Sequence, residues 1–276
     1  MTAVPISVRG PSPTVTSAAD DLLDGLRQWD LWGRLGWLEI KRRYRRTMIG
    51  PFWSAISLGA FVLALGGVGA GLWSKEVKDY LPFLAAGMVV WVFMSAVITE
   101  SCTLFISSLS LFRQMRFNYS VLAYALVYRN FMVFLHNMLV YVVIILIYSP
   151  SKIGPALVLA VPGMALVLIN CVWIALLFGM VCLRFRDLQQ LITTLVQIAM
   201  FVTPIFWPPE SLQGVMHIFY VELNPLYHLI TIVRAPLLNQ VPPFEVYVAT
   251  GLITAAGWTL TYACFRYFRR RIAYWS

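Results

Sequence analysis

Residues Thr203 to Leu238 read TPIFWPPESLQGVMHIFYVELNPLYHLITIVRAPLL and lie between two long apolar runs. A loop between membrane spans is usually polar, but apolar side chains recur along both halves of this stretch. Asn224-Pro225 divides the halves, because proline cannot continue the preceding helix and asparagine caps a new one. At about 1.5 Å per residue each half reaches roughly 18–20 Å, which is short of the roughly 30 Å hydrocarbon core. The stretch therefore predicts a re-entrant pair of half-helices, over residues 208–240.

The composition indicates a polytopic membrane protein with an all-α fold, since 60% of the 276 residues are hydrophobic and 12% are charged. At about 20 residues per span, the chain has room for about six spans and for no separate soluble catalytic domain. The net charge of +9 comes from short basic clusters between apolar runs, so it does not indicate a nucleic-acid partner. The four cysteines form no CxxC pair, which predicts packing roles rather than disulfides or a metal site.

Three regions follow from the apolar pattern: a flexible tail over residues 1–16, an amphipathic interface helix with a basic cluster over 17–50, and a transmembrane domain over 51–276. Arg and Lys concentrate near one set of span ends, which places both termini in the cytoplasm and the 208–240 segment outside. The six spans are expected at Pro51–Trp73, Pro82–Ile106, Phe131–Tyr148, Pro155–Leu183, Leu188–Trp207 and Val246–Phe268.

The segment after the tail has the features of a helix lying in the membrane interface. Ser17 opens a capping pattern, and Leu22, Leu26 and Trp29 share one helical face. The apolar face shifts after Gly33, which predicts a bend there. Tryptophans along an amphipathic helix favour the interface plane. The helix is either a simple surface anchor or an anchor that also contacts a cytoplasmic partner.

A second amphipathic piece lies in the cytoplasmic loop Ser107–Ser120, which reads SSLSLFRQMRFNYS. A short helix with this pattern can insert into a groove of a partner protein. The alternative is a plain interfacial turn.

The motifs of several enzyme classes are absent from the sequence. It has no GxxxxGK[ST], so ATP hydrolysis is expected from another subunit, and it has no HExxH or GxSxG. No cofactor or metal is therefore expected in this chain. Six spans enclose a path poorly on their own, so a two-fold dimer is expected.

Charged groups inside apolar spans are costly and point to function. Glu100 and Arg129 fall at similar depth in neighbouring spans, and we expect them to form an ion pair. The alternative is that Glu100 faces water at the interface. If the pair exists, exchanging the two charges is expected to rescue the loss caused by either single replacement.

Aromatic residues are dense in the first span, the fifth span and the re-entrant segment. Their faces can stack on the CH-rich faces of sugar rings, which suits the sliding of a polymer. The alternative is that they form the interfacial belt and core of an ordinary membrane protein. The candidates for lining a channel are Trp53, Phe61, Phe201, Phe206, Trp207, Phe219 and Tyr220.

Five motifs remain to be interpreted: Arg45-Arg-Thr-Met-Ile-Gly-Pro-Phe-Trp53, Glu100-Ser-Cys, Leu183-Arg-Phe-Arg-Asp187, Phe201-Val-Thr-Pro-Ile-Phe-Trp-Pro-Pro209 and Asn224-Pro-Leu-Tyr-His228. Together they resemble the type-2 ABC exporter permeases for O-antigen, capsule and teichoic-acid polymers (the Wzm-like family), from about Leu31 onward. The resemblance implies a homodimer in the bacterial inner membrane, with two separate nucleotide-binding ATPase subunits that bind ATP and Mg. It also implies a polyprenyl-diphosphate-linked glycan as cargo.

The resemblance also assigns roles to residues. ATPase movement is expected to enter through Leu26, Trp29, Leu111, Phe112, Arg113, Arg116 and Phe117, and the re-entrant pair around Asn224 and Pro225 is expected to form the outer gate. The basic cluster Lys41, Arg42, Arg43, Arg45 and Arg46 is expected to receive the diphosphate, since guanidinium groups match phosphate geometry. The alternative for this cluster is anchoring on anionic membrane lipid.

Three other functions remain open at this stage. The first is an ABC permease for a small lipid or drug. The second is a membrane-embedded glycosyltransferase or phosphotransferase, which needs converging acidic residues near a membrane face. The third is a passive channel or scaffold.

Overall fold

A computed structural model covers residues 1–276, and the structure describes residues 17–45, 47–50, 52–108 and 118–275, with side chains through 269. The predicted tail, Arg46 and the coupling residues Leu111 to Phe117 lie outside the described residues. The described part of the chain is helical. Its helices are α1 (Ala18–Arg27), α2 (Trp29–Tyr44), α3 (Phe52–Leu72), α4 (Val77–Ser101), α5 (Leu104–Ser107), α7 (Ser120–Tyr148), α8 (Ala160–Arg184), α9 (Leu188–Val202), α10 (Val215–His217), α11 (Pro225–Leu237) and α12 (Phe244–Trp275), with short turns η1 (Pro150–Lys152), η2 (Pro155–Leu159), η3 (Pro209–Ser211) and η4 (Ile218–Glu222).

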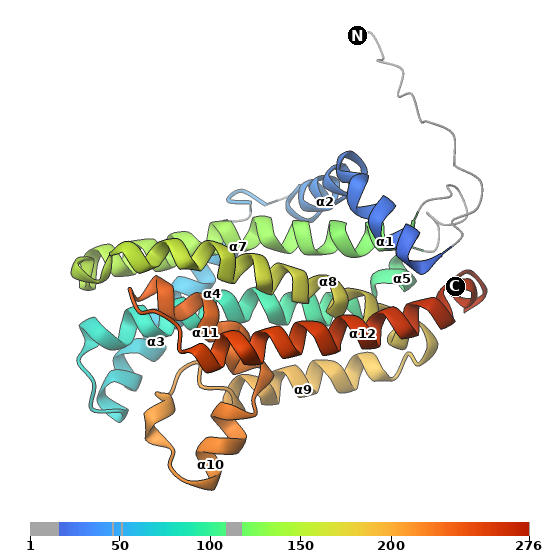
Figure 1. Ribbon diagram of the computed structural model, residues 1–276. Coiled ribbons are helices and arrows are strands. Elements are labelled where there is room, and N and C mark those ends of the chain that lie inside the picture. Colours follow the sequence, from blue (N-terminus) through green and yellow to red (C-terminus); the bar gives the residue numbers. More distant parts are fainter. Residues whose placement is uncertain (1–16, 46, 51, 109–117, 276) are drawn as a thin grey trace.

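The long helices run side by side in one bundle (Figure 1). Five of them are long and apolar enough to cross a membrane: Phe52–Leu72, Val77–Ser101, Ser120–Tyr148, Pro155–Arg184 and Phe244–Arg269. The protein is therefore a multi-pass membrane protein. The predicted fifth span is shorter than expected, because α9 holds 15 residues and reaches about 22 Å.

Two span boundaries differ from the prediction for the same reason. The third span begins at Ser120 rather than Phe131, and the second begins at Val77 rather than Pro82. Arg129 and Asn130 interrupt the apolar run of the third span, and Lys78 and Asp79 precede that of the second. In the structure each helix continues through these polar residues.

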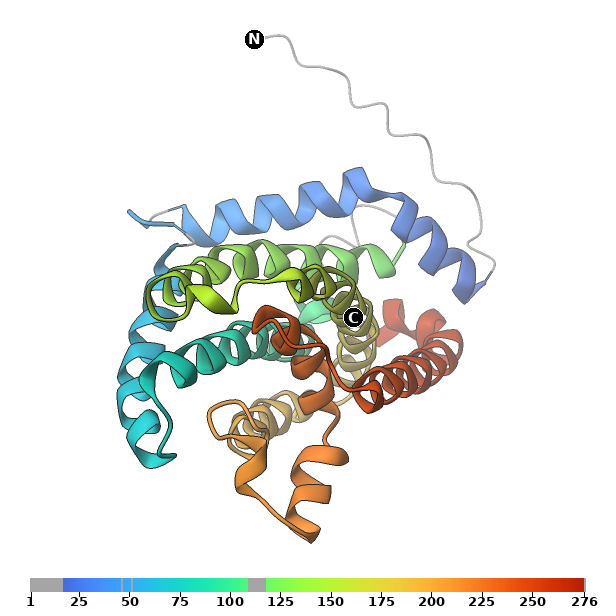
Figure 2. The ribbon, with the colours of Figure 1, turned by 60° about the vertical axis from the view of Figure 1, so that its left-hand side comes forward.

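Helix α4 is the centre of the bundle. Its sequence is apolar all round, a pattern that favours burial on every face. It packs against α3, α7, α8, α9 and α11, and 78% of its most apolar 18-residue stretch is buried. Figure 2 shows it enclosed by these neighbours. We call the end of the bundle that carries α1 and α5 the α1 end, and the opposite end the far end.

Helices α1 and α2 lie across α7 on the outside of the bundle (Figures 1 and 2). Ser17 caps α1, as predicted, by accepting a hydrogen bond from the Asp20 N–H at 3.1 Å. The predicted bend after Gly33 is wrong, because α2 continues through Gly33. The helix is interrupted at Gln28 instead, where the backbone angles lie outside the helical region. Leu26 and Trp29 therefore belong to different helices. Gly36 allows α2 to approach α7, since a Cβ there would lie 2.9 Å from the Ala125 carbonyl oxygen.

The segment that was expected to form two similar half-helices is unequal. Asn224 caps α11 as predicted: its side-chain oxygen accepts hydrogen bonds from the N–H groups of Leu226 at 3.0 Å and Tyr227 at 3.3 Å. Helix α11 is buried against α4, α8 and α12. The first half is only α10 followed by the π-helical turn η4, and it projects from the bundle (Figure 1). Its start is set by Gly214, whose φ of 62° stops an earlier helix.

Candidate functional site

A cluster of four charged side chains joins α2 to the spans α4 and α7 near the α1 end. Glu100 of α4 accepts hydrogen bonds from Arg129 of α7 at 2.5 Å and from the Asn130 amide at 2.8 Å. The predicted ion pair between Glu100 and Arg129 is therefore confirmed. The Arg129 side chain is 13% exposed, so its charge needs a partner there.

Two more members of this cluster come from α2. Arg43 donates to the second carboxylate oxygen of Glu100 at 2.5 Å, and Glu39 pairs with Arg129. In the order Arg43, Glu100, Arg129, Glu39 the charges alternate in sign. The two middle residues each contact two opposite charges, and the two outer residues each contact one. Attraction to Glu100 raises the pKa of Arg43, even though partial burial lowers it. We call these four residues the charge cluster.

The charge cluster changes the prediction for the basic segment 41–46. Arg43 is 44% exposed but already pairs with the carboxylate of Glu100, so its guanidinium is partly occupied. Lys41, Arg42 and Arg45 are exposed. The binding of a diphosphate by these three remains a prediction.

A second tie holds α1 to the bundle through Asp21, which is 1% exposed. Its carboxylate accepts hydrogen bonds from the backbone N–H groups of Tyr119 at 3.3 Å and Ser120 at 3.1 Å. It also pairs with Arg269 of α12 at 3.1 Å. The first N–H groups of a helix have no partner within it, so Asp21 acts as the cap of α7 from another helix. We call this contact the Asp21 clasp.

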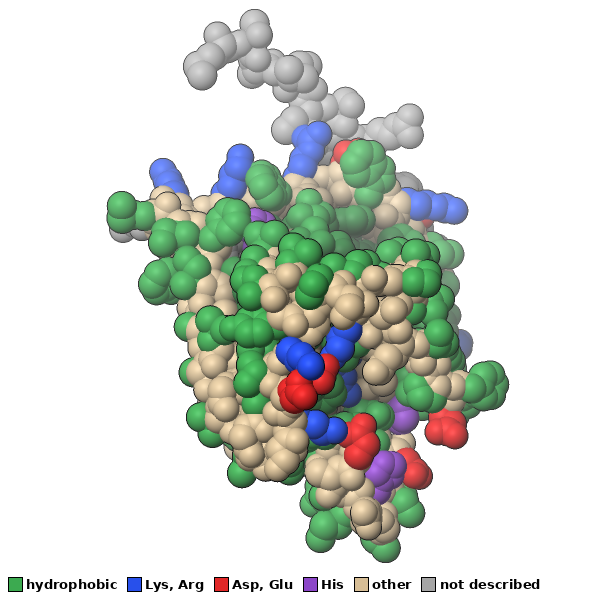
Figure 3. Space-filling model, turned by 90° about the vertical axis from the view of Figure 1, so that its left-hand side faces the viewer, with side chains coloured by type: hydrophobic (Ala, Val, Ile, Leu, Met, Phe, Trp, Pro, Cys, Tyr) green, Lys and Arg blue, Asp and Glu red, His purple; other side chains and the backbone are tan. Residues whose placement is uncertain are grey.

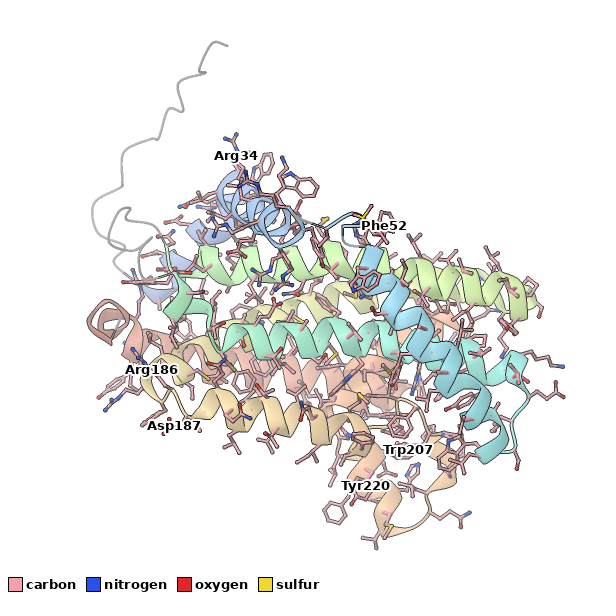
Figure 4. The ribbon with its side chains drawn as sticks, turned by 180° about the vertical axis from the view of Figure 1, so that it is seen from behind. Arg34, Phe52, Arg186, Asp187, Trp207 and Tyr220 are labelled. Atoms are coloured by element: carbon pink, nitrogen blue, oxygen red, sulfur yellow. The ribbon has the colours of Figure 1, made fainter. Side chains whose placement is uncertain are left out.

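The turn after α9 is held by side-chain hydrogen bonds rather than by the backbone hydrogen bonds of a helix. The indole N–H of Trp207 donates to the Phe201 carbonyl at 3.0 Å, and the Asn224 amide donates to the Thr203 hydroxyl at 3.1 Å. Trp207 and Asn224 therefore hold the segment between α9 and α11 in place. In Figure 4, Trp207 lies beside the bundle, whereas Tyr220 lies on the projecting segment.

The other aromatic candidates divide by exposure. Phe219 is 63% exposed and Trp53 is 61% exposed, and Phe61, Phe201 and Tyr220 are also exposed. Phe206 is half-buried and stacks edge-on with Phe201 at 5.7 Å. None of these exposed aromatics lines the apolar cavity between α1, α2, α7, α8 and α12. Their role in lining a path remains a prediction.

The far end of the bundle carries a separate group of charges (Figure 3). Lys152 pairs with Asp79 at 2.7 Å, and Lys78 pairs with Glu76 at 2.6 Å. Among the described residues, no group of three or more His, Cys, Asp or Glu side chains is placed to hold a metal ion.

A family model described as ABC-2 type transporter matches residues 31–238. The chain belongs to the ABC-2 type transporter family. The matched region includes the charge cluster and the segment from α9 to α11, and it leaves out α1 and α12. Membership makes this permease a transport subunit rather than a catalytic enzyme, and it confirms the resemblance to Wzm-like type-2 permeases.

Curated relatives of the permease carry one description. The permease is 24% identical over 222 residues to the O-antigen export system permease protein RfbA of Klebsiella pneumoniae, in an alignment that covers 78% of this chain and 84% of the relative. It is 21% identical over 201 residues to the protein of the same name from Myxococcus xanthus, covering 71% and 76%.

Arg234 of helix α11 is buried, with 3% of its surface exposed. Its guanidinium donates to the Pro204 carbonyl at 2.6 Å and lies 4.4 Å from the ring centre of Phe83. It therefore joins α11 to the turn after α9 and to α4. Sequence alone offered one signal, since a charge within an apolar helical stretch faces protein or water rather than lipid.

We predict that Arg234→Lys loosens this turn without disturbing the α1 end. Lysine keeps the charge but lacks the planar fork that reaches Pro204 and stacks on Phe83. Amide hydrogen exchange of residues 205–207 is expected to rise about tenfold, which matches the loss of one charged hydrogen bond of about 1.5 kcal/mol. Exchange mass spectrometry measures this, with the exposed Arg186→Lys as control. Unchanged exchange in Arg234→Lys would contradict the tie.

Proposed function

We propose that this permease exports a lipid-linked polysaccharide, O-antigen or capsule, across the bacterial inner membrane. The observation that carries the proposal is the alignment with O-antigen export permeases over most of both chains. The transporter is a homodimer of this chain with two cytoplasmic ATPase subunits, which bind ATP and Mg. Both termini lie in the cytoplasm, as the distribution of Arg and Lys indicates.

The geometry supports a path for the ATPase movement. Helices α1 and α2 lie outside the bundle and are tied to α4 and α7 by the charge cluster, and to α7 and α12 by the Asp21 clasp. A push on α1 would therefore reach three spans through short polar contacts. Leu26 and Trp29 are exposed on this surface, which fits contact with a partner.

The projecting segment of α10 and η4 supports a role at the outer side. It carries exposed aromatic and aliphatic side chains, and it is joined through Asn224 to the buried α11. A movement of α11 in the bundle would therefore move the segment. We propose that this segment gates the outer end of the path between the two protomers.

Lys41, Arg42 and Arg45 remain the proposed site for the diphosphate of the cargo lipid, together with Arg46. Lys41 and Arg42 lie in the last turn of α2 and Arg45 follows that helix, and all three are exposed. This is the level at which the head group of a membrane lipid would lie. A permease for a small lipid or drug is the second candidate, because the exposed apolar surfaces alone do not require a sugar.

The test is to purify the permease with its cognate ATPase subunit and to measure ATP hydrolysis in vesicles. Undecaprenyl-diphosphate-linked glycan is expected to stimulate hydrolysis, and Phe112→Ala or Arg113→Glu to remove that stimulation while the protein still inserts. Stimulation by small amphiphiles alone would overturn the polysaccharide proposal in favour of the second candidate.

A further inference from the structure

An apolar groove of about 790 Å³ lies between the interface helices and three spans. Its roof comes from α1 and α2, and its walls come from α7, α8 and α12. Among its lining residues are Leu22, Leu26, Trp32, Tyr128, Ile169 and Trp258. Its volume is within the range of sites that bind small molecules.

The position of the groove determines what can reach it. Along α7 its lining runs from Tyr124 to Met132, which is about 12 Å of helix. One leaflet of the hydrocarbon core is about 15 Å thick. Because the walls are membrane-spanning helices, the groove opens toward the interior of one leaflet, and its depth matches a single fatty acyl chain.

The rim of the groove has the chemistry of a lipid head-group site. Arg266 lies one turn beyond the lining residue Tyr262 on α12, and Arg27 follows the lining residue Leu26; both arginines are exposed. The Trp32 indole N–H donates to the Leu26 carbonyl at 3.2 Å, so this ring stands between the apolar groove and the polar surface. Basic side chains above an apolar slot complement a phosphate above an acyl chain.

We propose that this groove binds one acyl chain of an anionic phospholipid of the inner leaflet, with its phosphate at Arg266 and Arg27. A polyprenyl tail is much longer than one leaflet and would extend out of the groove. The bound chain fills the space between α1 and the spans. It therefore joins the Asp21 clasp in setting the position of the interface helix.

The test is native mass spectrometry of the full permease in mild detergent, titrated with phosphatidylglycerol. We expect the wild type to retain about one lipid per chain and Ile169→Trp, which fills the groove, to bind at least tenfold more weakly. Val161→Trp is the matched control, because Val161 is exposed on the same helix α8 but does not line the groove. Equal retention by Ile169→Trp and the wild type would overturn the proposal.

Arg266→Gln gives a second measurement that does not depend on packing, because Arg266 is exposed. It is expected to reduce the preference for phosphatidylglycerol over phosphatidylethanolamine about tenfold. An unchanged preference would overturn the head-group assignment. Displacement of phosphatidylglycerol by equimolar undecaprenyl phosphate would assign the groove to the cargo lipid instead, and loss of dimer in Ile169→Trp would assign it to a second copy of this chain.

Discussion

Asp21→Ala is expected to release α1 from the bundle and to abolish export. The replacement removes the acceptor for the first N–H groups of α7, at Tyr119 and Ser120, and the carboxylate partner of Arg269. The loss of a helix cap together with charged hydrogen bonds costs about 3 kcal/mol. Thermal unfolding in detergent and hydrogen exchange of residues 18–27 measure the effect.

The pKa of the Asp21 carboxyl indicates what a neutral replacement at this position is expected to do. Burial raises that pKa above its ordinary value of 3.8, although the hydrogen bonds from Ser120 and the charge of Arg269 lower it. A group with a raised folded pKa favours folding most below its ordinary pKa, and its contribution falls as pH rises through the folded pKa. At neutral pH the buried charge therefore carries a desolvation cost, which a neutral side chain of the same shape avoids.

Asp21→Asn separates the loss of the hydrogen-bond acceptor from the loss of the buried charge. Asparagine keeps one oxygen to accept a hydrogen bond from the start of α7, so it is expected to retain more stability and more export than alanine does. Asp24→Ala is the control on the same helix, because Asp24 is partly exposed and pairs only loosely with Arg27 at 3.6 Å. If Asp24→Ala destabilises the permease as much as Asp21→Ala, the clasp does not hold α1.

The features that sequence predicted well are local or depend on one apolar pattern. The capping of α11 by Asn224 follows from two adjacent residues, and the helical spans follow from runs of apolar side chains. The pairing of Glu100 with Arg129 was predictable because both charges lie at the same depth in consecutive spans. In each case the physical rule needs no knowledge of how distant segments pack.

The features that sequence missed depend on which distant segments meet. Nothing near Asp21 in the sequence indicates that it caps a helix that begins at Ser120, since the contact requires α1 to lie across α7. Arg43 was interpreted as part of a surface cluster, because its partner Glu100 is 57 residues away. The break at Gln28 was missed because hydrophobic periodicity shifts gradually, whereas one backbone angle ends a helix.

Glu100→Ala is expected to disrupt the charge cluster and to lower both stability and export strongly. The carboxylate accepts from Arg43, Arg129 and Asn130, so its loss leaves Arg129 with Glu39 alone and removes the carboxylate partner of Arg43. Removing one partner from a buried ion pair costs about 3–5 kcal/mol, and we expect about 3 kcal/mol because the α2 side of the cluster is partly exposed. Thermal unfolding and export of glycan by cells measure the two effects.

The cluster also changes the expectation that exchanging Glu100 and Arg129 would rescue each single loss. In the exchanged protein, arginine at 100 would lie beside Arg43 and glutamate at 129 beside Glu39, so two attractive contacts would become repulsive. The two-site exchange is therefore expected to fail. Inverting all four charges restores alternation, and it is expected to recover stability that the two-site exchange does not.

Exchange of Glu76 and Lys78 is the matched control for charge inversion. These residues also pair, at 2.6 Å, but both side chains are mostly exposed, and exposed pairs contribute little because water screens them. The control is expected to keep normal stability and export. If the two-site exchange of Glu100 and Arg129 recovers as fully as the four-site inversion, then Arg43 and Glu39 are not coupled to the pair. Interface helix α2 would then have to transmit movement to α4 and α7 by apolar packing alone.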